Sequence, residues 1–122
     1  MGVVTFGHGD EVVTLGPAVV PNHEDPYAGG SVVVELHGAG LVATRSVFVF
    51  ASSGLSSFFA ELAESWRGWS GVKLWESPEH DLTIEAKFVS GGHDRLRFAA
   101  QNGPTPTWEA WIEVEVEPFL SG

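Results

Sequence analysis

The chain has 122 residues, of which 16 are acidic and 6 basic, and it contains no cysteine. One domain over residues 1–122 is the expected organisation at this length, and the missing cysteine excludes disulfides, thiolate metal ligands and a cysteine nucleophile. The formal net charge of −10 argues against nucleic acid and membrane surfaces as partners, because both are bound through lysine and arginine.

Two short strands are predicted near the N-terminus, at Val3–Phe6 and Glu11–Leu15. No basic segment followed by an apolar run precedes them, so the sequence predicts no signal peptide. Together with the absence of cysteine, this favours a cytoplasmic location. Residues 20–30 contain two prolines, two glycines and adjacent acidic residues, a composition that predicts a mobile loop.

A β-hairpin is predicted next, because two β-rich runs, Ser31–His37 and Leu41–Phe50, flank a glycine-containing turn. Residues 54–67 then follow a helical period, with a stripe formed by Leu55, Phe58, Phe59, Leu62 and Trp66. We expect Ser53 to cap this helix and Arg67 to lie in its last turn. Gly68 is placed to end it in the left-handed conformation.

The C-terminal half contains the short strand-like run VKLW and three longer runs of alternating residues, Asp81–Val89, Arg95–Gln101 and Trp108–Glu117. The alternation predicts that the following side chains of these three runs face inward: Leu82, Ile84, Ala86, Phe88, Leu96, Phe98, Ala100, Trp108, Ala110, Ile112, Val114 and Val116. In an antiparallel meander the arginine-bearing middle run lies between two acid-bearing strands, and opposite charges pair across strands. The acidic side chains of the last run outnumber these arginines. The last strand is therefore predicted to carry an acidic stripe around Trp111, formed by Glu109, Glu113, Glu115 and Glu117.

These elements predict an α+β fold, a curved antiparallel sheet of six or seven strands with a single helix packed on one face. A β-sandwich or partly closed barrel is the alternative, since two layers could close over the hairpin.

Two surfaces are candidate binding sites. Trp111 among the acidic residues of the last strand resembles an interface hot spot, and the competing interpretation is that it only stacks on arginine or is covered by another segment. Trp66, Trp69 and Trp75 could instead line a small-molecule pocket between helix and sheet. We favour a packing role for these three tryptophans.

Catalytic and metal-binding signatures are absent from the sequence. Four of the five histidines stand beside acidic residues at predicted turns, without the HxxxH or HExxH spacing of a metal site. No phosphate-binding glycine loop and no G-x-S-x-G motif occurs. We therefore expect a non-enzymatic protein with no cofactor and no metal.

The segments GLSSFFAELAESWRGWSGVKLWES, DLTIEAK, GHDRLRF and WEAWIEVEVEP resemble a family of small, uncharacterised actinobacterial proteins that form a domain of unknown function. The resemblance covers residues 31–118. The order of hairpin, FF-containing helix and meander is similar to that of immunity proteins of wall-associated-protein A type toxins. This resemblance implies a small acidic protein that neutralises a toxin of its own cell, and it brings no catalytic residues. We therefore expect a protein partner with a basic surface.

Overall fold

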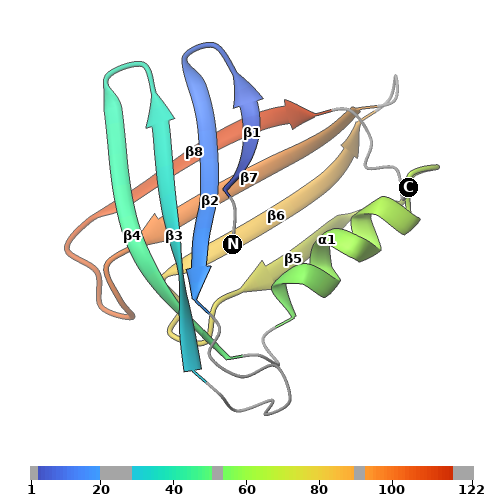
Figure 1. The fold of residues 1–122 in the computed structure, drawn as a ribbon. Helices are drawn as coiled ribbons and strands as arrows, with labels where there is room; N and C mark the ends of the chain where they lie inside the picture. Colours follow the sequence, from blue (N-terminus) through green and yellow to red (C-terminus); the bar gives the residue numbers. More distant parts are fainter. Residues whose placement is uncertain (1–2, 20–28, 51–53, 90–92, 117–122) are drawn as a thin grey trace.

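The computed structural model describes residues 3–19, 29–50, 54–89 and 93–116. Within these residues the chain forms two antiparallel four-stranded sheets and one helix (Figure 1). The first sheet has the strand order β1 (Val4–His8), β2 (Glu11–Val19), β3 (Gly29–Gly38) and β4 (Leu41–Phe50). The helix α1 (Leu55–Glu64) follows. The second sheet has the order β5 (Val72–Glu76), β6 (Leu82–Val89), β7 (His93–Gln101) and β8 (Glu109–Val116).

The predicted single sheet of six or seven strands is wrong, because the structure is mostly β and divides its strands between two sheets. Each sheet is a meander in which every strand pairs only with its neighbours in sequence, and the ladder stops between β4 and β5. The alternation within a strand specifies which of its faces is buried and not which strand it pairs with, so the pattern does not mark where the ladder ends. The alternative of a β-sandwich or partly closed barrel, in which two layers pack together, is closer to the observed arrangement.

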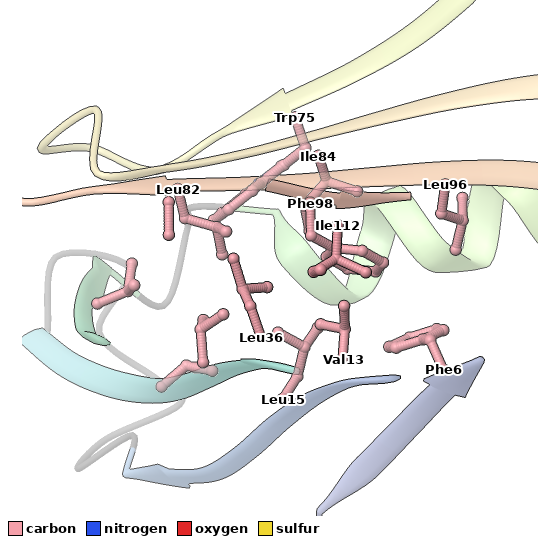
Figure 2. Packing of buried hydrophobic residues seen from close by; sticks show 14 of the residues in the cluster. Phe6, Val13, Leu15, Leu36, Trp75, Leu82, Ile84, Leu96, Phe98 and Ile112 are labelled. Carbon is pink, nitrogen blue, oxygen red and sulfur yellow. The ribbon is translucent and has the colours of Figure 1, made fainter. Parts of the chain in front are cut away.

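The two sheets pack face to face around one core. Figure 1 shows the strands of the second sheet running across those of the first, and β8 accordingly lies against β1, β2 and β3. Phe6 of β1 and Phe98 of β7 meet between the layers, with ring centroids 5.1 Å apart. Figure 2 shows how side chains from both sheets, including Leu36, Ile84 and Ile112, point into this shared interior.

Alternation along the strands places the predicted inward residues in the core. A side chain at every second position faces the opposite sheet, because successive strand residues point to opposite faces. The prediction is confirmed for these fully or nearly fully buried residues of the second sheet: Leu82, Ile84, Ala86, Leu96, Phe98, Ala100, Ile112 and Val114. In the first sheet Val32, Val34 and Leu36 of β3 are buried in the same way.

Helix α1 lies between two strand edges rather than on one face of a single sheet. Its Phe59 stacks on Phe6 of β1, with ring centroids 5.3 Å apart. On the other side its Glu61 forms an ion pair of 3.2 Å with Lys73 of β5. The helix therefore bridges the edge of the first sheet to the edge of the second, and it buries Phe58 and Leu62.

The helix is shorter than predicted at its C-terminal end. Ser65 leaves the helical conformation, and its amide bonds to the carbonyls of Glu61 and Leu62. Trp66 and Arg67 therefore lie beyond the last turn. Trp66 is 45% exposed, so its predicted place in the buried stripe is wrong. Gly68 has a left-handed φ of 115°, but it lies beyond the C-cap residue Ser65, so the prediction that it ends the helix is wrong.

Two further expectations concern the start of the helix and the loop. Gly54 occupies the N-cap position without a side-chain hydrogen bond, and the expected cap Ser53 lies outside the described residues. Of the predicted loop 20–30, residues 20–28 lie outside the described residues, whereas Gly29 and Gly30 begin β3.

A polar cluster joins the two sheets at the β5–β6 turn. Asp81 is 1% exposed, and its Oδ2 accepts a 3.2 Å bond from Nε of Arg45 in β4. Its Oδ1 accepts a 2.7 Å bond from the Ser77 hydroxyl. The Ser77 oxygen in turn accepts bonds from the amides of Asp81 and Leu82. This buried network ties the turn of one sheet to a strand of the other.

No helix among the described residues has the length and apolarity needed to cross a membrane.

Candidate functional site

The outward face of β8 is defined by its register with β7. Trp111 lies opposite Ala99, Glu113 opposite Arg97, and Glu115 opposite Arg95. The intervening β8 residues Ile112 and Val114 are buried, so the pleat directs the others away from the core. The acidic residues and the tryptophan named from the sequence therefore share one face, except that Glu117 lies outside the described residues.

Trp111 is held in place while remaining accessible. Its side chain is 52% exposed, and the Arg97 guanidinium lies 4.2 Å from the centroid of its ring. A cation over an aromatic ring attracts it electrostatically, and the planar guanidinium also stacks well on indole. The neighbouring Ala99 is small, which leaves room for the ring above the sheet. The indole thus presents a preoriented apolar surface.

The carboxylates of β8 are partly neutralised by Arg95. Its Nη2 lies 2.7 Å from Oε1 of Glu115, and its Nε lies 3.7 Å from Oε1 of Glu113. The hydrogen bond from Arg95 holds the pKa of the Glu115 carboxyl below its usual value, and the same bond raises the pKa of Arg95. No ion pair joins Glu109 to another residue in the described part of the chain.

A hollow of about 530 Å³ lies where β8 meets the β1–β2 turn. Trp111, Glu113, Glu115 and Arg95 contribute one wall, and the turn contributes His8, Glu11 and Gly7. The sequence did not place His8 and Glu11 at this site, because about a hundred residues separate them from β8. The only local signal was the glycine-rich HGD turn, which does not indicate what it will face.

Gly7 allows the two walls of the hollow to approach each other. Its φ of 85° is left-handed, and a Cβ built on it would lie 2.7 Å from Cγ1 of Val114 and still closer to the carbonyl oxygen of Glu11. Real Cβ atoms do not sustain such contacts, so glycine is required for this junction of turn and strand.

The lining of the hollow favours a cationic group. Among its described residues, three carboxylates (Glu11, Glu113 and Glu115) face a single guanidinium, that of Arg95. The accessible indole of Trp111 adds an aromatic surface on which a flat cation such as guanidinium can stack. In chemical terms the arrangement suits recognition of arginine or lysine side chains.

The three tryptophans of the alternative pocket lie in three different environments. Trp75 is 7% exposed and belongs to the core between the sheets (Figure 2). Trp69 is half-buried against Phe88, with ring centroids 5.7 Å apart. Trp66 is exposed at the end of the helix, where Arg67 approaches its ring to 4.9 Å. Within the described residues the three side chains therefore do not share one environment, and Trp75 is part of the closed packing of the core.

The histidine–acid pairs within the described residues lie at or beside separate turns of the fold. In the part of the chain that the structure describes, no three histidine or acidic side chains lie close enough together to hold a metal ion. The pair at residues 23–25 lies outside that part.

Comparison with known proteins shows that one family model covers most of the chain. A family model described as "Family of unknown function (DUF6228)" matches residues 10–119. This range begins in the β1–β2 turn and includes Glu11, α1 and all of β8. No curated protein and no solved structure matches the chain.

Proposed function

We propose, from the premise that the chain belongs to the family of unknown function DUF6228, that it is a non-enzymatic protein-binding module whose contact surface is the outer face of β8. The observation that carries this proposal is the half-exposed Trp111, oriented by Arg97 beside a hollow rimmed by carboxylates. Tryptophan is enriched among the residues that dominate binding energy at protein interfaces.

The partner is a protein with a basic surface. The net charge of −10 and the excess of carboxylates over cations in the hollow both favour such a partner. Complementary charge mainly raises the association rate, whereas a buried aromatic anchor slows dissociation. Glu11 and Glu109 have the larger part in attracting the partner, because Arg95 already pairs with Glu113 and Glu115.

The most specific form of the proposal is an immunity-type inhibitor that acts in the cytoplasm and occludes a basic toxin. The order of hairpin, helix and meander, which is similar to that of immunity proteins, supports this form. So does the small size and acidity of the chain. Such an inhibitor acts by covering the toxin surface and needs no chemistry of its own.

The test requires the partner first and then a matched pair of variants. The tagged protein is used to isolate, from a related host, a basic protein that is retained at low salt and released at high salt. Its Kd is then measured for the wild type, Trp111→Ala and Trp66→Ala. Trp66 is the control because it is also exposed and also lies against an arginine.

We expect Trp111→Ala to weaken binding by about 30-fold, the equivalent of a hot spot of about 2 kcal/mol. Trp66→Ala is expected to bind like the wild type, and both variants should keep the wild-type melting temperature. Glu11→Gln should slow association, whereas Glu64→Gln on the helix should not. Full-strength binding by Trp111→Ala would show that the assigned face is wrong.

A further inference from the structure

A second hollow, of about 560 Å³, lies between the first turn of α1 and the inner side of the first sheet. Its wall includes Phe6 and Val4 of β1, Leu15 and Ala18 of β2, and Phe59 of α1. It is separate from the face of β8, since none of its described lining residues belongs to the second sheet.

The local geometry explains why this space is unfilled. The register between β2 and β3 shifts between Leu15 and Ala18. Gly16 and Ala18, which line the hollow at this shift, contribute little side-chain volume. Helix α1 is drawn toward the edges β1 and β5 by its contacts with Phe6 and Lys73 and does not cover the sheet. As a result Val4, which lies on the same side of β1 as the buried Phe6, is 55% exposed.

The chemistry of the lining selects the class of ligand. Every described lining side chain is apolar except that of Ser56, whose hydroxyl can make one hydrogen bond. No charged side chain is among them, so a ligand carrying a charge would lose hydration without gaining a partner. The volume is within the range of about 300–1,000 Å³ that small-molecule pockets occupy.

We propose that this hollow binds an uncharged, apolar small molecule that carries a single hydrogen-bonding group, for which a straight-chain alcohol is the model. The stacked rings of Phe6 and Phe59 form the apolar wall, and the Ser56 hydroxyl at the start of α1 receives the polar end. The site is independent of the protein-binding face, so either can be present without the other.

The experiment uses the uncharged fluorescent probe N-phenyl-1-naphthylamine and the intact chain. We expect saturable binding with one probe per chain and displacement by 1-hexanol, 1-octanol and 1-decanol. Each added methylene should tighten binding by about fourfold until the hollow is filled. Octanoate, with the same chain length as octanol but a charge, should displace the probe at least about tenfold less well.

Two matched variants locate the site. Val4→Glu places a charge in the hollow, whereas Val42→Glu places the same charge at an exposed valine on the outer face of β4. Val4→Glu is expected to weaken probe binding at least about tenfold and Val42→Glu to leave it unchanged. Ala18→Leu, which fills the hollow without adding charge, should also reduce binding and serves if Val4→Glu does not fold.

Three results would overturn the proposal. These are absence of saturable probe binding by the folded wild type, equal loss in Val4→Glu and Val42→Glu, and displacement by octanoate as strong as by octanol.

Discussion

Breaking the buried ion pair between the sheets is expected to cost more when the arginine is removed than when the aspartate is removed. The Arg45 side chain is 34% exposed, whereas that of Asp81 is 1% exposed. Arg45→Ala leaves a carboxylate in the interior without its cation. Asp81→Ala leaves a guanidinium that water can still reach. The desolvation penalty of the orphaned charge decides the difference.

The magnitudes follow from the contacts. Asp81→Ala removes one hydrogen bond to a charged donor, about 1.5–3 kcal/mol, and one to a hydroxyl, about 0.5–1.5 kcal/mol. Because Arg45 can rehydrate, we expect a loss of about 2–4 kcal/mol in the free energy of unfolding. Arg45→Ala should cost about 3–5 kcal/mol, the range for an uncompensated buried charge.

Urea unfolding of the two single variants and the double variant measures these values. The double variant should lose less than the sum of the two single losses, because the partners are in direct contact. Glu61→Ala is the control, since its exposed pair with Lys73 should contribute no more than about 1 kcal/mol. A loss below about 1 kcal/mol for Arg45→Ala, or a smaller loss than for Asp81→Ala, would refute the argument.

Three further predictions concern the turn, the outer face and the core. Gly7→Ala should lower the free energy of unfolding, measured in urea, by about 2–4 kcal/mol, because alanine is strained at the left-handed φ and its Cβ would clash with β8. Gly9→Ala is the control, since Gly9 also has a positive φ but faces open space, and its free energy of unfolding should fall by only about 1–2 kcal/mol. Because the folded-state pKa of Glu115 is lowered, its stabilising contribution is present above the ordinary glutamate value of 4.5 and is lost as the pH falls through the lowered pKa. Glu115→Gln should therefore unfold more readily than the wild type at neutral pH and converge with it in acid, and a difference that grew in acid would contradict this sign. Trp75→Ala should lower the free energy of unfolding by about 3–5 kcal/mol and Trp66→Ala by less than about 1 kcal/mol, because only Trp75 is buried. Both losses are measured as shifts of the urea midpoint at constant slope, and similar losses in the two variants would contradict the burial of Trp75.

Local periodicity predicted which side chains are buried but not how the strands are grouped. Alternation in β6 and β7 correctly placed Ile84 and Phe98 inward, because the two-residue period follows from strand geometry alone. Pairing between strands depends on contacts between distant parts of the chain, so the residues of β4 and β5 do not themselves show that these two strands are unpaired. Trp66 continued the helical spacing of the stripe, yet the backbone had already left the helix at Ser65.

The candidate site shows the same division between local and long-range information. The sequence identified the shared outer face of Trp111 and its glutamates, since these residues lie on one strand. It did not identify the contribution of Glu11, because the contact between the β1–β2 turn and β8 arises only when the two sheets pack together. The sequence predicted that an arginine-bearing strand lies beside an acidic one, but it did not predict that Arg95 pairs with both Glu113 and Glu115.

The division of the chain into two consecutive meanders also bears on synthesis by the ribosome. Every ladder of the first sheet lies within residues 4–50, so its backbone pairing can be completed before the second sheet has been translated. The apolar face formed by Val13, Leu36 and Val47 has no second layer until residues 72–116 emerge. We therefore expect the nascent protein to be most open to chaperones and to aggregation in the interval between synthesis of the first sheet and emergence of the second, when this apolar face lacks its covering layer.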